Sequence, residues 1–447
     1  MNCYIGLDTG TSSVKGAIVS QDGKILGTAS GNFRYFEKES GKLLDPKAFT
    51  DVCIKVINDL AALSGEYELK AICPCCASGN LLLLDEKYEP MTPIIGWQST
   101  VDEAEFNTYY TDEETADLYN TVGWPALNSF PVAFYPWFFH NKKEMLENAG
   151  MICMSAEYLN FALTGKWGIS HSMGTPFYLM DQKNGTYNKK MLDKFGISED
   201  KLPPIYDKGT VLGKVNNDKL NVPKDTVIVL GSFDHPSGAT GSGVYNEGEM
   251  LLSCGTSWVE FFPVSSREKA INAGFLVDRF MLGGAPYCVM ASIASISDMI
   301  NKLKKHFLNG ISYDEFDTLA LQSKMGCNGL NFSFTEEDYA KDVSGFNKSD
   351  IARAIIESAA NLLKKNLEIA EEKSLSADKI TIIGGITNSD VCVKIIAETL
   401  DKEITVVNGV SAGAVGAAML GAIGAGDFND EFDAFSAMEF DKKVYKP

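Results

Sequence analysis

The sequence has 447 residues, more than a single hydrophobic core usually sustains, so two domains of roughly 200 residues each are expected. Hydrophobic residues make up 45% of the chain and charged residues 22%, which is typical of a globular protein. The formal net charge of −19 argues against nucleic acid or an anionic membrane as a partner.

Targeting and cysteine patterns give further expectations. The chain enters an apolar segment within three residues, and no apolar run reaches the roughly 20 residues of a membrane span, which predicts a cytoplasmic protein without a signal peptide. The ten cysteines are expected to be reduced thiols. Cys73, Cys75 and Cys76 cluster, so a metal site stays open beside the simpler interpretation that they fill the end of a buried strand.

The first predicted element is a β-hairpin with the sequence YIGLDTGTSSVKGAIV at residues 4–19. Its two flanks are apolar and rich in β-forming residues, while its tip holds an acid, a glycine and four hydroxyl groups. Backbone N–H groups and hydroxyls in such a tip can donate hydrogen bonds to phosphate oxygens, and an acid there can hold hydrated magnesium. The candidate residues are Asp8, Gly10, Thr11, Ser12, Ser13 and Lys15.

Further elements follow in the first half. A strand is expected at Lys24–Ala29, a helix begins at Asp45-Pro46, and two more strands are expected at Lys70–Cys73 and Leu81–Leu84. The polar turn between the last two strands contains Ser78 and Gly79. The aromatic stretch at 130–139 is most simply core or interdomain packing.

A strand at Thr226–Leu230 leads directly into Asp234 and a run of small residues. A carboxylate at the C-terminal end of a strand, before a helix of small residues, is a strong position for chemistry. The alternative is that Asp234 only caps the helix.

A second hairpin, MLLSCGTSWVEFF at 250–262, repeats the first. Gly255, Thr256 and Ser257 each stand 245 residues after Gly10, Thr11 and Ser12 (255 − 10, 256 − 11, 257 − 12). The repeat predicts a duplicated domain in which both tips face one cleft and grip a polyphosphate from two sides. We place the domains at 1–225 and 226–447.

The C-terminal part contains a predicted helix at Ile351–Ala370 and a strand at Ile380–Ile383. The strand runs into two glycines that let the backbone pass against a base or ribose, and a polar residue there caps the next helix. The residues concerned are Gly384, Gly385, Asn388 and Ser389. Residues 411–426 predict a tightly packed helix of small residues that closes the nucleotide side.

The two hairpins, Asp234 and the late Gly-Gly segment resemble the FGGY carbohydrate kinases of the actin, hexokinase and Hsp70 superfamily. The resemblance implies an α/β fold of two duplicated actin-like (ribonuclease H-like) domains with a nucleotide cleft between them. It implies ATP and magnesium as cofactors and Asp234 as the general base. It implies a sugar pocket at Ser78, Gly79, Trp97 and Gln98, although a simple connection and a core tryptophan would also explain these residues. His235 either touches the substrate or merely follows the base.

The sequence departs from the family's sugar-binding pattern. Xylulose kinases and their relatives generally carry a Met-His pair near the turn at Ser78 and Gly79, and an aspartate and an arginine after the tryptophan; this chain has neither. The region 323–343 is also shorter than in many members, which leaves a lid and any homodimer contact open.

The leading hypothesis is an ATP-dependent kinase of a neutral sugar or polyol, such as a ketopentose or deoxyhexulose. No GxxxxGK[ST] or GxGxxG motif offers another phosphate site. None of the four arginines (Arg34, Arg267, Arg279 and Arg353) falls in the segments around the predicted sugar, which disfavours an anionic substrate. An actin-like or activator ATPase, and a family member that binds without turnover, remain alternatives.

Overall fold

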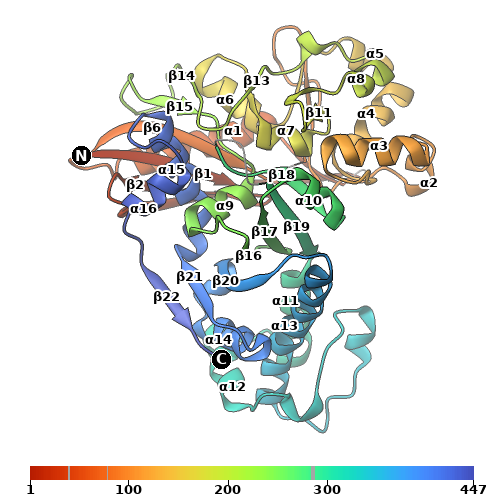
Figure 1. Ribbon diagram of the computed structural model, residues 1–447, viewed down its shortest axis with the longest axis vertical. Helices are drawn as coiled ribbons and strands as arrows, with labels where there is room; N and C mark the ends of the chain where they lie inside the picture. Colours follow the sequence, from red (N-terminus) through yellow and green to blue (C-terminus); the bar gives the residue numbers. More distant parts are fainter. Residues whose placement is uncertain (39–40, 78, 283–286) are drawn as a thin grey trace.

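Two mixed β-sheets organise the protein, as the computed structural model shows for residues 1–38, 41–77, 79–282 and 287–447 (Figure 1). The first sheet has the strand order β14-β15-β6-β1-β2-β3, and the second has the order β18-β19-β17-β16-β20-β21-β22. The first contains β1 (Asn2–Thr9), β2 (Ser13–Ser20), β3 (Ile25–Asn32), β6 (Glu68–Cys76), β14 (Val211–Lys214) and β15 (Val227–Val229). The second contains β16 (Gly248–Cys254), β17 (Trp258–Val264), β18 (Leu276–Arg279), β19 (Tyr287–Ile293), β20 (Ala377–Gly384), β21 (Ile404–Val407) and β22 (Lys442–Tyr445).

The two sheets share the predicted internal repeat. β1 pairs antiparallel with β2 and parallel with β6, and β16 pairs antiparallel with β17 and parallel with β20. β1 and β16 end at Thr9 and Cys254, while β2 and β17 begin at Ser13 and Trp258, so the offset of 245 residues (254 − 9 and 258 − 13) persists in the strand boundaries. Both predicted hairpins are confirmed.

Helices cover both faces of the first sheet. Alternate residues of a strand point to opposite faces, so Leu7 packs with α1 (Pro46–Ala61) in one buried cluster. Tyr4 packs with α15 (Ala412–Gly424) in another cluster on the other side. The second sheet is covered on one face by α13 (Lys348–Glu372) and α14 (Asp390–Leu400).

The predicted small-residue helix at 411–426 is α15, and it packs unusually closely against α9 (Asp234–Ser242). A Cβ added to Gly416 would lie 1.9 Å from the Ser237 carbonyl oxygen, and one added to Gly241 would lie 2.0 Å from the Ala412 carbonyl oxygen. Only residues without a side chain allow the two helix backbones to approach this far. Because α9 begins at Asp234, this contact fixes the helix that carries the candidate base.

The strand predicted at Thr226–Leu230 is β15, and it pairs parallel with β6 in the first sheet. A segment near the end of the chain also contacts the first sheet, because helix α15 packs against β1. The division into 1–225 and 226–447 remains a proposal. The pairing of β15 argues for placing the boundary after this strand.

The cysteines of the protein are buried thiols. All ten cysteines are buried and unpaired, and Cys73, Cys75 and Cys76 fill the end of β6, as the simpler interpretation predicts. Within the described residues, no cluster of three His, Cys, Asp or Glu side chains is placed to hold a metal ion. No helix in the described part of the chain has the length and apolar character to cross a membrane.

Candidate active site

A cleft of about 830 Å³ is lined by residues of both sheets. It brings together most of the residues predicted from the sequence, although they are far apart along the chain. Its wall includes Asp8, Gly10, Thr11, Ser12, Ser13, Lys15, Trp97, Asp234, His235, Gly255, Thr256, Ser257, Gly384, Gly385, Asn388 and Ser389. An open groove of about 940 Å³ on the first half of the chain is lined by none of these residues.

The first hairpin tip joins β1 to β2 and is held from outside the hairpin. The indole Nε1 of Trp97 donates a hydrogen bond to the Thr11 hydroxyl oxygen at 3.1 Å, and the Tyr35 hydroxyl donates to the Thr11 carbonyl oxygen. Asp8 and Lys15 are direct cross-strand partners where the tip begins. The tip is therefore held in place, with the carboxyl group of Asp8 and the amine of Lys15 where the two strands meet it.

The second tip is held by the segment that enters α11 (Ile296–Leu308). The Ser297 hydroxyl donates to the Gly255 carbonyl oxygen at 2.6 Å, and the backbone N–H of Ser295 donates to the Ser257 hydroxyl at 3.1 Å. Ser297 also lines the cleft. Sequence reasoning missed it, because a serine in a stretch of small and apolar residues carries no distinctive spacing.

Asp234 is the first residue of α9 and lies at the cleft wall with 28% of its side chain exposed. The structure gives Phe233 the capping position, and no side chain caps this helix, so Asp234 is not its N-cap. Its Oδ1 accepts the backbone N–H of His235 at 2.9 Å and lies 3.8 Å from the His235 Nε2. The carboxylate is thus held in place yet accessible to a ligand in the cleft.

Asp8 lies close enough to Asp234 for the two carboxyl groups to influence each other. Burial raises the pKa of Asp8 to about 7, the Asp234 carboxylate adds to this increase, and Lys15 partly offsets it. A carboxyl with a strongly raised pKa, beside a second carboxylate in a cleft, is typical of a functional site. The pair would be stabilised by a cation placed between it and a phosphate.

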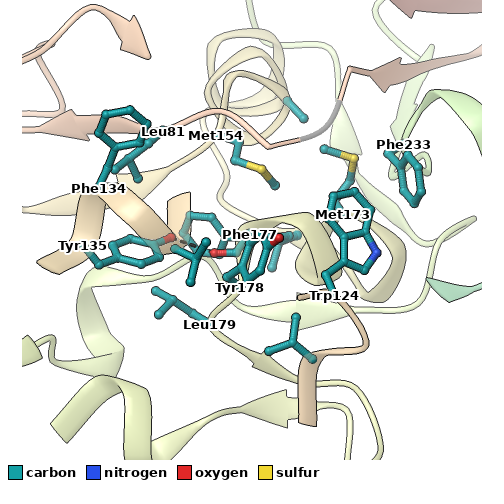
Figure 2. Close-up of a cluster of buried hydrophobic side chains, with 14 of the residues drawn as sticks. Leu81, Trp124, Phe134, Tyr135, Met154, Met173, Phe177, Tyr178, Leu179 and Phe233 are labelled. Carbon is teal, nitrogen blue, oxygen red and sulfur yellow. Dashed lines mark hydrogen bonds between the residues drawn. The ribbon is translucent and has the colours of Figure 1, made fainter. Parts of the chain in front are cut away.

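Aromatic side chains line the part of the cleft next to Asp234. Trp97, Trp124 and Phe130 contribute to this wall, together with Leu276 and Met290. Trp124 is 3% exposed, and its ring packs edge-to-face on Phe130 and Phe233. Figure 2 shows Trp124 and Phe233 at one end of a buried hydrophobic cluster, and Phe130 packs against the same cluster.

Two residues predicted for the sugar pocket, Gly79 and Gln98, do not line the main cleft among the described residues. Gly79 does not line the cleft within the described residues; it has a φ of +72°, and an added Cβ would lie 1.9 Å from the Phe130 ring. Gln98 lines a small adjoining cavity of about 30 Å³ beside Trp97 and Thr11. Ser78 falls outside the described residues. Gly79 therefore packs against Phe130, which lines the cleft.

The loop after β20 forms the opposite part of the cleft. Gly384 has a φ of +96°, and an added Cβ would lie 2.4 Å from the Cys254 carbonyl oxygen of β16, so glycine is needed where the two strands end. The Ser389 hydroxyl accepts the backbone N–H of Cys392 at 2.9 Å and caps α14. The predicted cap is confirmed, and Asn388 stands beside it in the cleft wall.

Helices α11 and α12 (Tyr313–Gln322) add residues that the sequence did not single out. Lys304, Tyr313, Phe316 and Asp317 line the cleft near the Gly-Gly loop. Both helices have an ordinary amphipathic pattern, which says that one face is buried but not what that face borders. Only the fold brings them to the cleft.

Fold and cleft together define a two-domain phosphotransferase, and comparison with known proteins gives its family. The N-terminal domain of the FGGY family of carbohydrate kinases matches residues 3–241, and the C-terminal domain of that family matches residues 332–425. The chain belongs to the FGGY family of carbohydrate kinases. Its class of reaction is therefore ATP-dependent transfer of a phosphoryl group to a carbohydrate hydroxyl.

Individual relatives are distant but extend over nearly the whole chain. A xylulose kinase from Staphylococcus epidermidis is 25% identical, and the match covers 99% of this chain and 92% of that protein. A gluconokinase from Bacillus subtilis is 22% identical, and the match covers 97% of this chain and 90% of that protein. A ligand-bound xylulose kinase structure from Lactobacillus acidophilus has a TM-score of 0.87 at 21% identity, over 100% of this chain and 94% of that one. A Plasmodium falciparum glycerol kinase with ADP has a TM-score of 0.84 at 18% identity, with the same coverage. These likenesses confirm the predicted two-domain actin-like fold.

Proposed function

We propose that the protein phosphorylates a neutral ketose or polyol, such as a ketopentose or a deoxyhexulose. The observation that carries this proposal is the cleft itself, because Asp234, two hairpin tips suited to phosphate and several aromatic side chains all line it. Aromatic rings stack on the apolar faces of sugars, and His235 can donate a hydrogen bond to a hydroxyl.

The charges around the part of the cleft where the sugar is proposed to bind support a neutral substrate. No arginine lines the cleft in the described part of the chain. Arg267 donates to Gln182 and to the backbone of Asn120 and Thr121, while Arg353 is paired with Glu357 and Glu398. A carboxylate or phosphate on the substrate would therefore lack the planar, bidentate partner that usually recognises it.

The mechanism follows from the placement of the residues. We propose that Asp234 accepts the proton of the attacking hydroxyl, since it is the accessible carboxylate beside the aromatic wall. The backbone N–H groups and hydroxyls of both tips donate hydrogen bonds to the phosphate oxygens, and Lys15 adds a positive charge. Catalysis of this kind consists mostly of positioning and charge neutralisation.

Magnesium fits the same end of the cleft. Because burial and Asp234 raise the pKa of Asp8 to about 7, a divalent cation there would stabilise the charged carboxylate. We propose that Asp8 would hold the ion through water molecules. When bound, the ion would supply neutralisation of the charge on the phosphates.

The location of the protein in the cell is part of the proposal. All ten cysteines are buried as free thiols, and burial raises the pKa of those along β6, such as Cys73. Unpaired thiols are the normal state in a reducing compartment, whereas secreted proteins tend to form disulfides. We propose that the protein acts in the cytoplasm, where ATP is available.

A comparison of neutral and anionic sugars tests the substrate class. In a coupled assay at fixed ATP concentration, neutral ketopentoses and deoxyhexuloses should be phosphorylated with a kcat/KM well above that of gluconate or of a sugar phosphate. The reason is that no arginine among the described residues lines the cleft, so the cost of desolvating an anion would not be offset. A higher kcat/KM for any anionic sugar than for its neutral analogue would refute the proposal of a neutral acceptor.

Removal of one hydroxyl from either tip tests the two-sided phosphate grip. Thr11→Val and Thr256→Val should each weaken ATP binding by roughly 2- to 10-fold, the worth of one net hydrogen bond. The first change also removes the partner of the Trp97 Nε1, so it is expected to affect sugar binding too. Thr256→Ser, which keeps a hydroxyl, serves as the control. If calorimetry shows a loss of ATP affinity in only one of the two variants, the grip is not two-sided.

A further inference from the structure

A lysine of α11, Lys304, lines the cleft together with the Gly384–Gly385 loop. Lys304 on α11 is 8% exposed, and its ammonium group has no ion pair or hydrogen bond to any residue that the structure describes. Its Nζ instead lies 3.5 Å from the ring centroid of Tyr313 and 5.9 Å from that of Phe316. Burial lowers the pKa of this lysine. The aliphatic part of the side chain is covered, while the ammonium group reaches the cleft without a hydrogen-bond acceptor among the described residues, so it is available to bind a ligand there.

The groups around Lys304 have the character of a nucleobase-binding pocket. Ile300 and Ile356 add apolar surface to the cleft wall next to it, and the Gly384–Gly385 loop lines the same cleft. Helices α11, α12, α13 and α14 pack together in the lower part of Figure 1. Flat apolar walls with few polar groups are what a planar heterocycle requires.

Asp317 supplies an acceptor in the same corner. Its carboxylate lies near enough to Lys304 to raise the lysine's pKa, yet the two side chains do not form an ion pair in the described structure. The only hydrogen bond to this carboxylate among the described residues is a long one, from the Cys392 Sγ at 3.9 Å. A donor and an acceptor therefore line the same cleft without bonding to each other among the described residues.

We propose that Lys304 and Asp317 read the edge of the adenine ring: the Lys304 ammonium donates to a ring nitrogen, and the Asp317 carboxylate accepts from the exocyclic amine. Adenine presents an acceptor nitrogen beside an amino group on both of its polar edges, which matches this donor and acceptor. The inference deepens the proposed function, on which it rests, by naming the residues that select the nucleotide.

The position of Tyr313 explains how the charge is kept without a ligand. Its hydroxyl donates to the Asn301 Oδ1 at 3.0 Å, which holds the ring over the ammonium group. The Tyr313 side chain is otherwise exposed at the mouth of the cleft. The Tyr313 ring, held by Asn301, therefore borders the ammonium group of Lys304 on one side.

Binding measurements on ligand fragments separate a base contact from a phosphate contact. By calorimetry on the full chain, Lys304→Met should weaken the binding of adenosine and ADP by roughly 10- to 100-fold, because it removes a charged hydrogen bond. The binding of inorganic tripolyphosphate should not change. Lys305→Met, which alters the exposed neighbouring lysine of α11, should match the wild type with all three ligands.

Two outcomes would overturn the inference. If Lys304→Met weakens tripolyphosphate but not adenosine, the lysine contacts phosphate; if neither changes, its role is structural. Because no sugar is needed, failure of the substrate proposal would leave these results unaffected.

A second variant tests the proposed role of Asp317 as a hydrogen-bond acceptor independently. Inosine triphosphate carries an oxygen in place of the adenine amine, so the wild type should bind ATP more tightly. Asp317→Asn can donate to that oxygen and should reduce the ratio of ATP to inosine triphosphate affinity by roughly 10-fold. An unchanged ratio would show that Asp317 does not read the base.

Discussion

Replacement of Asp234 by asparagine should lower kcat by roughly 10²- to 10⁴-fold, because it removes a positioned base from the attacking hydroxyl. The amide has the same shape as the carboxylate, and its oxygen can still accept the backbone N–H of His235. Loss of one negative charge next to Asp8 should also bring the pKa of Asp8 down towards its usual range. ATP affinity should therefore be retained or slightly improved.

A matched control separates the loss of the base from a general change in charge. Asp314→Asn removes a different carboxylate from the same cleft wall, where it is exposed and distant in sequence from the hairpins and from α9. Its kcat should stay close to that of the wild type. If Asp234→Asn also keeps near-normal turnover, Asp234 is not the base. The proposal that the sugar binds beside Asp234 would then be wrong.

Gly416→Ala should destabilise the protein more than any surface change. The new Cβ would lie 1.9 Å from the Ser237 carbonyl oxygen and 2.8 Å from the Gly241 nitrogen, which belong to the backbone of α9. A helix backbone cannot move aside as a side chain can, so α9 and α15 must separate. Overpacking of this kind costs about 1 to 3 kcal/mol and occasionally more.

Urea unfolding measures this effect. The midpoint should fall for Gly416→Ala, while Gly345→Ala, at an exposed position where an added Cβ meets nothing within 4 Å, should leave it unchanged. Since α9 carries Asp234, the Gly416 variant should also lose activity below its unfolding midpoint. Equal midpoints for the two variants would show that the close helix contact does not support the fold.

Local sequence patterns were sufficient for the parts of the site that are local. Each hairpin tip is contained in one stretch of the chain, and a strand followed by an acid and small residues is also a local signal, so both tips and Asp234 were found. The helix of small residues at 411–426 was recognised because repeated glycine and alanine have few other uses in a helix of that length.

Other parts depend on contacts between distant segments. The hydrogen bond from Trp97 to Thr11 and the contact between Gly79 and Phe130 join residues whose relation no spacing reveals. Lys304 and Asp317 lie on amphipathic helices whose buried faces look like ordinary core. The pairing of β15 with β6 likewise needs the sheet order, which periodicity alone does not contain.

Phosphorus NMR of a reaction containing ATP, magnesium and one neutral ketose at a time tests the central claim most directly. We expect ADP and a sugar phosphate ester to appear together in a ratio of about one to one, with little ADP formed when the sugar is omitted. Asp234→Asn should form neither at a comparable rate. ADP release that proceeds equally without sugar, or the absence of a sugar phosphate across a panel of ketopentoses, deoxyhexuloses and polyols, would contradict the account.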